Sequence, residues 1–113
     1  MPKRDDRLLL QDIIEAGNKI IRFTAGLSYD EFKNDEKTID AVLRNFEVIG
    51  EAASRFTEKL QSDNPQIEWR KLKAFRNLLI HEYFGVNLAI VWDVIENYLP
   101  QTILSIQHIN VTE

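Results

Sequence analysis

The spacing of apolar residues is the feature that most constrains the fold of this chain. Apolar side chains recur at steps of three and four residues along most of the 113 residues, and alternation of apolar with polar residues is nowhere sustained. A period near 3.6 residues is typical of helices with one buried face, whereas a half-buried strand needs a period of two. The sequence therefore predicts an all-α protein, an antiparallel helical bundle of about four to five helices. No repeat or long linker divides it, so residues 1–113 are expected to form a single domain.

Residues with special backbone or capping preferences indicate where these helices begin and end. A first helix is predicted over about residues 5–25, ending near Gly26. Its apolar stripe consists of Leu9, Ile13, Ala16, Ile20 and Phe23. Ser28 and Glu31 have the capping-box spacing and predict a short helix through Phe32. A long helix with a continuous apolar seam is expected over about residues 36–61.

Two further helices are predicted in the second half of the chain. Asn64 and Pro65 break the pattern, so a helix is expected to begin at residue 67 or 68 and to end near residues 84–85, where a glycine follows. Asn87 is expected to cap a last helix through Leu99, with Pro100 kinking it or ending its first half.

Composition excludes several classes of protein. Apolar residues make up 44% and charged residues 28% of the chain, as in soluble globular domains. The absence of cysteine excludes a disulfide framework, a thiolate nucleophile and a zinc site with sulfur ligands. Acidic residues interrupt the N-terminal segment before a signal peptide could form, and no stretch approaches the about 20 apolar residues that span a membrane. A cytoplasmic protein with no membrane contact is expected.

One short stretch is basic although the formal net charge is −4. Arg70, Lys71, Lys73 and Arg76 lie within two turns of one predicted helix. Such a cluster is a candidate RNA-binding patch because phosphate binding depends on local positive charge. A solvated helix face explains the same pattern equally well.

The candidate catalytic residues lie on that same helix. Arg76 is followed by the polar Asn77, then by His81 and Tyr83. At about 100° per residue, Asn77 and His81 are neighbours one turn apart, whereas Arg76 and His81 diverge by about 140°. Either the helix loosens before Gly85, or the long Arg76 side chain swings round, or a second subunit completes the site. Tyr83 returns to the face of Arg76, although an aromatic residue that only packs is the alternative there.

These residues resemble the signature of the HEPN family in its Arg-x-x-x-x-His-x-Tyr form. The stretches 38–45, 48–52, 69–71 and 91–92 are similar, in matching order, to the HepT branch of that family. The resemblance covers nearly the whole chain, from the first helix to about Leu99. Upstream of the motif, Gly50 is expected to allow close helix approach, and Asp40, Asn45 and Glu51 are expected to make polar contacts within the bundle.

The resemblance implies the toxin of a type VII HepT/MntA toxin-antitoxin system. It implies a metal-independent endoribonuclease, without a cofactor, in which Arg76 and His81 are catalytic and Asn77 supports them. The partner would be a nucleotidyltransferase antitoxin of the MNT type that transfers AMP to Tyr83. The residue types suit this chemistry. Histidine exchanges protons near neutral pH, and arginine offers a permanently charged fork to phosphate oxygens.

A homodimer is expected because one chain holds a single motif histidine, whereas ribose 2′-hydroxyl attack needs both a base and an acid. His108, the other histidine, is expected on the surface. The main alternative is a non-catalytic HEPN protein that binds a nucleotide or a nucleotidyltransferase partner. A DNA-binding helix-turn-helix is disfavoured because residues 88–99 carry Asp93 and Glu96 and no basic residue. A metal hydrolase is disfavoured because His81 has no second histidine at ligand spacing.

Overall fold

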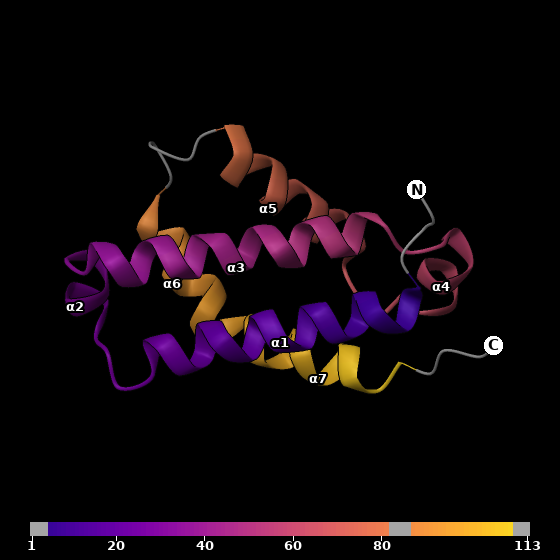
Figure 1. Cartoon of the computed structure of the whole chain (residues 1–113), viewed down its shortest axis with the longest axis horizontal. Coiled ribbons are helices and arrows are strands. Elements are labelled where there is room, and N and C mark those ends of the chain that lie inside the picture. The colour runs from indigo at the N-terminus through magenta and orange to yellow at the C-terminus, as the bar shows by residue number, and fades with distance from the viewer. Residues whose placement is uncertain (1–4, 82–86, 110–113) are drawn as a thin grey trace.

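The computed structural model describes residues 5–81 and 87–109, except for the side chains of Leu78, Ile80 and His81. In this part of the chain all regular structure is helical, which confirms the predicted all-α fold (Figure 1). In chain order the helices are α1 (Asp6–Thr24), α2 (Tyr29–Lys33), α3 (Glu36–Ser54), α4 (Glu58–Asp63), α5 (Trp69–His81), α6 (Leu88–Asn97) and α7 (Leu99–Gln107).

The core of the bundle is the long antiparallel pair α1 and α3 (Figure 1). Their facing stripes are apolar and almost fully buried: Leu9, Ile13, Ala16 and Ile20 on α1, and Val42, Leu43, Phe46, Ile49 and Ala53 on α3. Helix α7 packs against α1, and α5 packs against α3. The predicted periodicity thus corresponds to helices that each bury one face.

The connection between α1 and α3 follows the predicted turn chemistry. Gly26 has φ +79°, the left-handed region that glycine adopts without steric cost. Ser28 forms the complete capping box with Glu31 at the start of α2. Phe32 is fully buried, and its ring lies 5.1 Å from that of Trp92 on α6. This contact anchors the short α2 to the end of the bundle.

The predicted long helix over residues 36–61 is divided in the structure. Helix α3 ends at Ser54, and the Thr57 hydroxyl accepts a hydrogen bond from the Leu60 N–H, which begins α4. The Thr57 hydroxyl and N–H also donate to the Asp6 carboxylate at the start of α1, over 2.8 Å and 3.4 Å. The apolar seam continues through the break because Phe56 and Leu60 are both buried, so periodicity alone could not reveal the break.

The second half of the chain agrees with the other boundary predictions where it is described. Helix α5 begins at Trp69, and its predicted end near residues 84–85 lies outside the described residues. Asn87 caps α6 through its side-chain oxygen. Pro100 stands in the first turn of α7, so the predicted last helix is divided in two.

One expected member of the α1 stripe is exposed. Phe23 is 39% exposed and lies under the Arg22 guanidinium, 5.5 Å from the ring centroid. It lies in the last turn of α1, in which Thr24 is buried. None of the helices in the described residues is long and apolar enough to span a membrane.

Candidate active site

Arg76, Asn77 and His81 of the predicted motif lie on α5, which approaches α3 closely at Gly50. A Cβ atom added to Gly50 would lie 2.1 Å from Cβ and 2.6 Å from Cγ of Arg76. No side chain other than hydrogen fits in that space. The predicted role of Gly50 in close helix approach is confirmed, and the residue that it admits is the motif arginine.

The guanidinium of Arg76 is held by a carboxylate on α3. Arg76 Nη2 donates to Glu51 Oε2 over 2.5 Å, and the other carboxylate oxygen, Oε1, accepts from Nε and Nη2 of Arg55 over 3.1 Å and 2.9 Å. Glu51 therefore links two arginines from two helices. Such charge-assisted pairs are short and directional, so the carboxylate restricts the position of both guanidinium groups.

Glu51, Arg55 and Arg76 form a charged cluster in which the carboxylate compensates part of the positive charge. The hydrogen bond from Arg55, with the positive charges of Arg76 and Arg55, holds the pKa of Glu51 below its ordinary range, against a smaller opposing effect of burial. The carboxylate is thus ionised at neutral pH. One negative and two positive charges leave the cluster with an excess of one positive charge.

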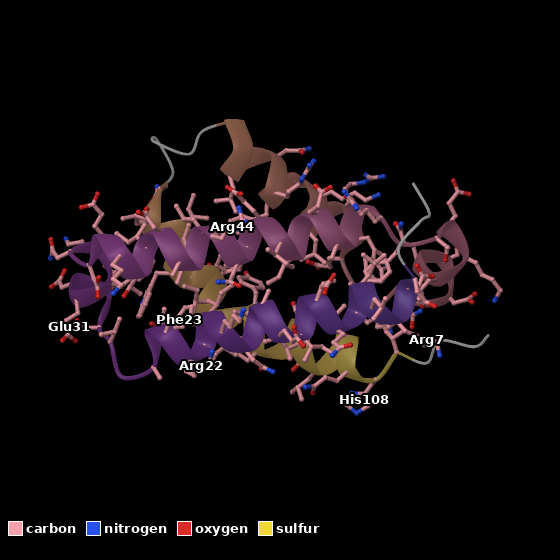
Figure 2. All side chains as sticks on the ribbon, viewed as in Figure 1. Arg7, Arg22, Phe23, Glu31, Arg44 and His108 are labelled. Atoms are coloured by element: carbon pink, nitrogen blue, oxygen red, sulfur yellow. The ribbon has the colours of Figure 1, made fainter. Side chains whose placement is uncertain are left out.

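The Arg76 side chain lies in a groove between α1, α3 and α5 with a volume of about 330 Å³. Three arginines line this groove: Arg44, which lies on α3 (Figure 2), Arg55 and Arg76. The remaining lining consists of Leu9, Asp12, Glu47, Val48, Glu51 and Ala52. The Arg76 side chain is 30% exposed, whereas its Nε is buried and has no hydrogen-bond partner among the residues that the structure describes.

The other motif residues are described only in part. Asn77 is exposed, and its Oδ1 accepts a long hydrogen bond of 3.4 Å from Arg76 Nη1. His81 is the last described residue of α5, and its side chain lies outside the description. Tyr83 lies entirely outside the described residues. Within the motif, the described side chains are therefore those of Arg76 and Asn77.

The predicted basic patch is spread over different sides of α5. Arg70 and Lys71 are exposed and Lys73 is partly exposed. Lys71 forms an ion pair of 3.1 Å with Glu68, on the side of α5 away from the Arg76 groove. Lys73 precedes Arg76 by three residues and is its neighbour on the helix surface. The patch is therefore a band around α5 rather than one face.

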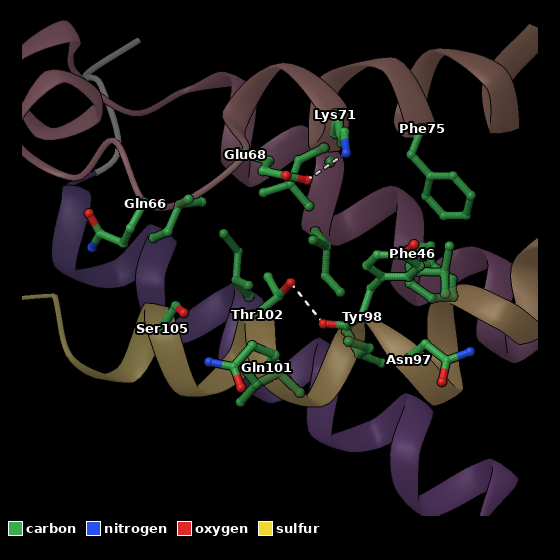
Figure 3. A pocket seen from close by; sticks show the side chains of 18 residues that line it. Phe46, Gln66, Glu68, Lys71, Phe75, Asn97, Tyr98, Gln101, Thr102 and Ser105 are labelled. Atoms are coloured by element: carbon green, nitrogen blue, oxygen red, sulfur yellow. Dashed lines mark hydrogen bonds and ion pairs between the residues drawn. The ribbon is translucent and has the colours of Figure 1, made fainter.

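A second hollow lies on the other side of α5. This cleft has a volume of about 440 Å³ between α5 and the helices α6 and α7, and most of its floor is apolar (Figure 3). Phe75 and Phe46 meet edge to face there at a centroid distance of 5.0 Å. Tyr98, at the junction of α6 and α7, lines the cleft and is 54% exposed.

Other polar residues singled out in the sequence have local roles. Asn45 donates to the Ala41 carbonyl of its own helix over 2.8 Å. His108 is exposed at the end of α7, as predicted, and its Nδ1 lies 2.6 Å from the Leu104 carbonyl oxygen. Among the residues described, no three side chains of His, Asp or Glu gather as a possible metal site.

Comparison with known proteins decides the family. Residues 13–109 match the sequence model of the family described as "Ribonuclease HepT-like". The chain belongs to the HepT-like ribonuclease family. The resemblance inferred from the motif is therefore confirmed, and the matched range contains both Arg76 and Tyr83.

Similar proteins from archaea and bacteria cover most of this HepT-like chain. It is 44% identical to "Putative RNase MJ0127" of Methanocaldococcus jannaschii, over 96% of the chain and 90% of the relative. It is 37% identical to "Probable ribonuclease HepT" of Thermococcus cleftensis, over 87% and 89%, and 32% identical to "Putative RNase TTE0752" of Caldanaerobacter subterraneus, over 84% and 85%. No solved structure is significantly similar to the chain.

The partners of Arg76 were not predictable from the sequence. Glu51 was expected to make a polar contact within the bundle, which it does, but its connection to the motif was not foreseen. The only signal was local: Glu51 and Arg55 are four residues apart, the spacing of a helical ion pair. Nothing in the sequence relates Glu51 to an arginine 25 residues later.

Proposed function

We propose that this protein is an endoribonuclease and the toxin of a HepT/MntA-type toxin-antitoxin system. The observation that carries the proposal is membership of the HepT-like ribonuclease family together with an intact Arg76, Asn77, His81 and Tyr83 motif. The placement of Arg76 supports it, because an arginine fixed beside a groove can stabilise a phosphate that gains negative charge. In this proposal the protein acts in the cytoplasm, where its RNA substrate is found.

The proposed reaction needs no metal ion. The ribose 2′-oxygen attacks the adjacent phosphorus while a base removes the 2′-hydroxyl proton. The bond from phosphorus to the 5′-oxygen breaks, and an acid protonates that oxygen, so the products are a 2′,3′-cyclic phosphate and a 5′-hydroxyl. His81 is the proposed proton-transferring group, and Arg76 is the proposed stabiliser of the phosphorane charge. Asn77 orients His81 or donates to phosphate.

We expect the active form to be a homodimer. One copy of His81 cannot serve at once as base and acid, whereas two copies across a two-fold axis supply both. The two-fold axis is expected to lie beside the motif, so that two copies of Arg76 and His81 come together. The cleft, on the side of α5 away from the Arg76 groove, has an apolar floor and the half-exposed ring of Tyr98, and is a further surface for this contact. An aromatic ring and an apolar hollow on one face can be self-complementary in a symmetric pair.

Cleavage of RNA in the presence of EDTA tests the proposed activity. We expect the wild-type protein to release fragments with 2′,3′-cyclic phosphate and 5′-hydroxyl ends. His81→Ala should be inactive, and Arg76→Ala should lose about a hundredfold or more in rate through the lost charge stabilisation. Mass spectrometry of the fragments identifies the ends. An enzyme that EDTA stops and magnesium restores would contradict the mechanism, and a substrate with 2′-deoxyribose at the cleaved position serves as the control.

We further propose that AMP transfer to Tyr83 controls the activity. The phenol oxygen of Tyr83 would attack the α-phosphorus of ATP on a nucleotidyltransferase antitoxin, releasing pyrophosphate and the phenol proton. The added phosphate and base would oppose RNA binding by charge and volume. Intact-mass measurement with the antitoxin, ATP and magnesium should show one added AMP on the wild type and none on Tyr83→Phe. An unmodified wild type, or equal modification of both proteins, would refute this control.

A non-catalytic protein that binds a nucleotide or a nucleotidyltransferase remains the second candidate. The exposed and partly exposed basic residues Arg70, Lys71 and Lys73 are compatible with either candidate, because both involve phosphate groups. The cleavage assay separates the two, since the second candidate predicts nucleotide binding without cleavage in every variant.

A further inference from the structure

We propose that Glu51 is a positioning residue for Arg76. It holds the guanidinium so that the edge not bonded to Glu51 faces the scissile phosphate. This inference rests on the proposed ribonuclease function and adds to it a residue outside the motif. It is carried by the contacts from Glu51 to Arg76 and to Arg55, and by the close fit of Arg76 against Gly50.

The aliphatic part of the Arg76 side chain is restricted by its packing against Gly50. Its Cβ and Cγ atoms occupy the space that a side chain at residue 50 would need, so α3 restricts the first part of the side chain. Movement is left mainly to the guanidinium end, which Glu51 holds through Nη2 at 2.5 Å. An arginine loses side-chain conformational entropy when it is ordered. Because Glu51 orders Arg76 before the substrate arrives, less of this cost remains for the chemical step.

Arg55 determines whether the Glu51 carboxylate assists or opposes phosphate binding. A lone carboxylate beside Arg76 would cancel the charge that attracts phosphate. Here Arg55 binds the other carboxylate oxygen through two hydrogen bonds, so one positive charge remains in the cluster. Arg55 also fixes the orientation of the carboxylate and directs Oε2 toward Arg76.

One nitrogen of the Arg76 guanidinium, Nη1, is available to donate a hydrogen bond to a ligand. Glu51 uses Nη2, and the 3.4 Å contact of Nη1 with Asn77 is long and therefore weak. Asn77 is exposed and can rotate away without disturbing the core. Nη1 is thus the donor that an RNA phosphate oxygen can take over, while the contact with Glu51 persists.

Single-turnover cleavage separates positioning from binding. We expect Glu51→Gln to lower the rate of the chemical step about tenfold and Glu51→Ala somewhat more, because misplacement of a reacting group slows chemistry strongly. The affinity for an uncleavable RNA with a 2′-deoxy substitution should stay within about twofold. Glu47→Gln is the matched control: it removes the same charge from the same groove and helix, and in the described residues no bond joins Glu47 to Arg76. Its rate of the chemical step should change less than that of Glu51→Gln.

A double-mutant cycle tests whether Glu51 acts through Arg76. In an Arg76→Lys background, Glu51→Gln should have little further effect, since lysine lacks the fork that Glu51 holds. Equal losses in both backgrounds would overturn the proposal, as would a wild-type rate for Glu51→Gln or an effect on affinity alone. Thermal unfolding of each variant shows whether lost folding explains lost activity.

A measurement without cleavage keeps this inference separate from the proposed function. In ¹⁵N-arginine NMR, the wild type should show hindered rotation of one guanidinium assigned to Arg76, and Glu51→Gln should lose it while Glu47→Gln retains it. If the wild type fails to cut RNA but Glu51→Gln frees the guanidinium, the proposed function fails and the positioning role stands. Free rotation in the wild type overturns the positioning role whatever the activity.

Discussion

The two sides of α5 differ in how closely they are packed. Toward α3, the backbone at Gly50 meets Arg76 so closely that a single methyl group would not fit. Toward α6 and α7, a cleft of about 440 Å³ remains, although large side chains such as Phe75 line it. The same helix is therefore fixed on one side and unfilled on the other. We infer that the α3 side serves to place Arg76, and that the cleft side is available for contact with another molecule.

The largest effect is expected from Gly50→Ala. The added methyl group would lie 2.1 Å from Arg76 Cβ and 3.2 Å from its Cα, so α5 would have to move away from α3. Overpacking of this kind costs about 1–3 kcal/mol, more than the about 1 kcal/mol that alanine gains over glycine in a helix. We expect a lower free energy of unfolding in urea and a strong loss of RNA cleavage.

Gly17→Ala is the matched control for that substitution. Gly17 also lies in a helix at a close contact, but its added Cβ would meet the outer atoms of the Ile103 side chain at 2.6 Å and 2.8 Å. A side chain can change its rotamer where a backbone cannot, so we expect a smaller loss of stability and nearly normal cleavage. Equal losses of stability and cleavage in the two variants would contradict a particular role of the α3–α5 contact in placing Arg76.

A smaller effect is expected on the cleft side. Because Tyr98 is 54% exposed, Tyr98→Ala should leave the stability of a single chain nearly unchanged, yet weaken a dimer that uses the cleft by about tenfold or more. Sedimentation over a range of concentrations measures the dissociation constant. Ile90→Ala, another exposed apolar residue at 49%, is the control away from the cleft. A dimer unaffected by Tyr98→Ala would place its interface elsewhere.

The smallest expected effect is the pH dependence contributed by Glu51. Its pKa is lowered in the folded protein, first by the hydrogen bond from Arg55, so its contribution to stability is fully present above its ordinary pKa of 4.5. The contribution is lost as the pH falls below 4.5 through the lowered value. Because Glu51 is 40% exposed, solvent screening keeps the effect small. Unfolding at pH 7 and pH 3 should show a slightly weaker pH dependence for Glu51→Gln, whereas an unchanged dependence would contradict the assignment.

Much of the fold was predictable from sequence because its determinants are local. The period of the apolar residues, the Ser28 capping box, Gly26 and Pro100 each act within a few residues, and the structure agrees with them. The division of the expected helix over residues 36–61 was not predictable. At the division, Thr57 bonds to Asp6, a residue 51 positions away, while the apolar seam continues without a break.

The candidate site likewise has features that are local in sequence and features that depend on tertiary structure. The sequence by itself determined the motif, the family, and the need for a small residue at Gly50, because residue type and spacing carry that information. Only the tertiary structure decided that Glu51 bonds to both Arg55 and Arg76, and that Lys71 faces the cleft with Glu68 while Arg76 faces the groove. The physical reason is that an ion pair between helices depends on how the two helices are set against each other. That relative placement results from packing of the whole core, which no local pattern encodes.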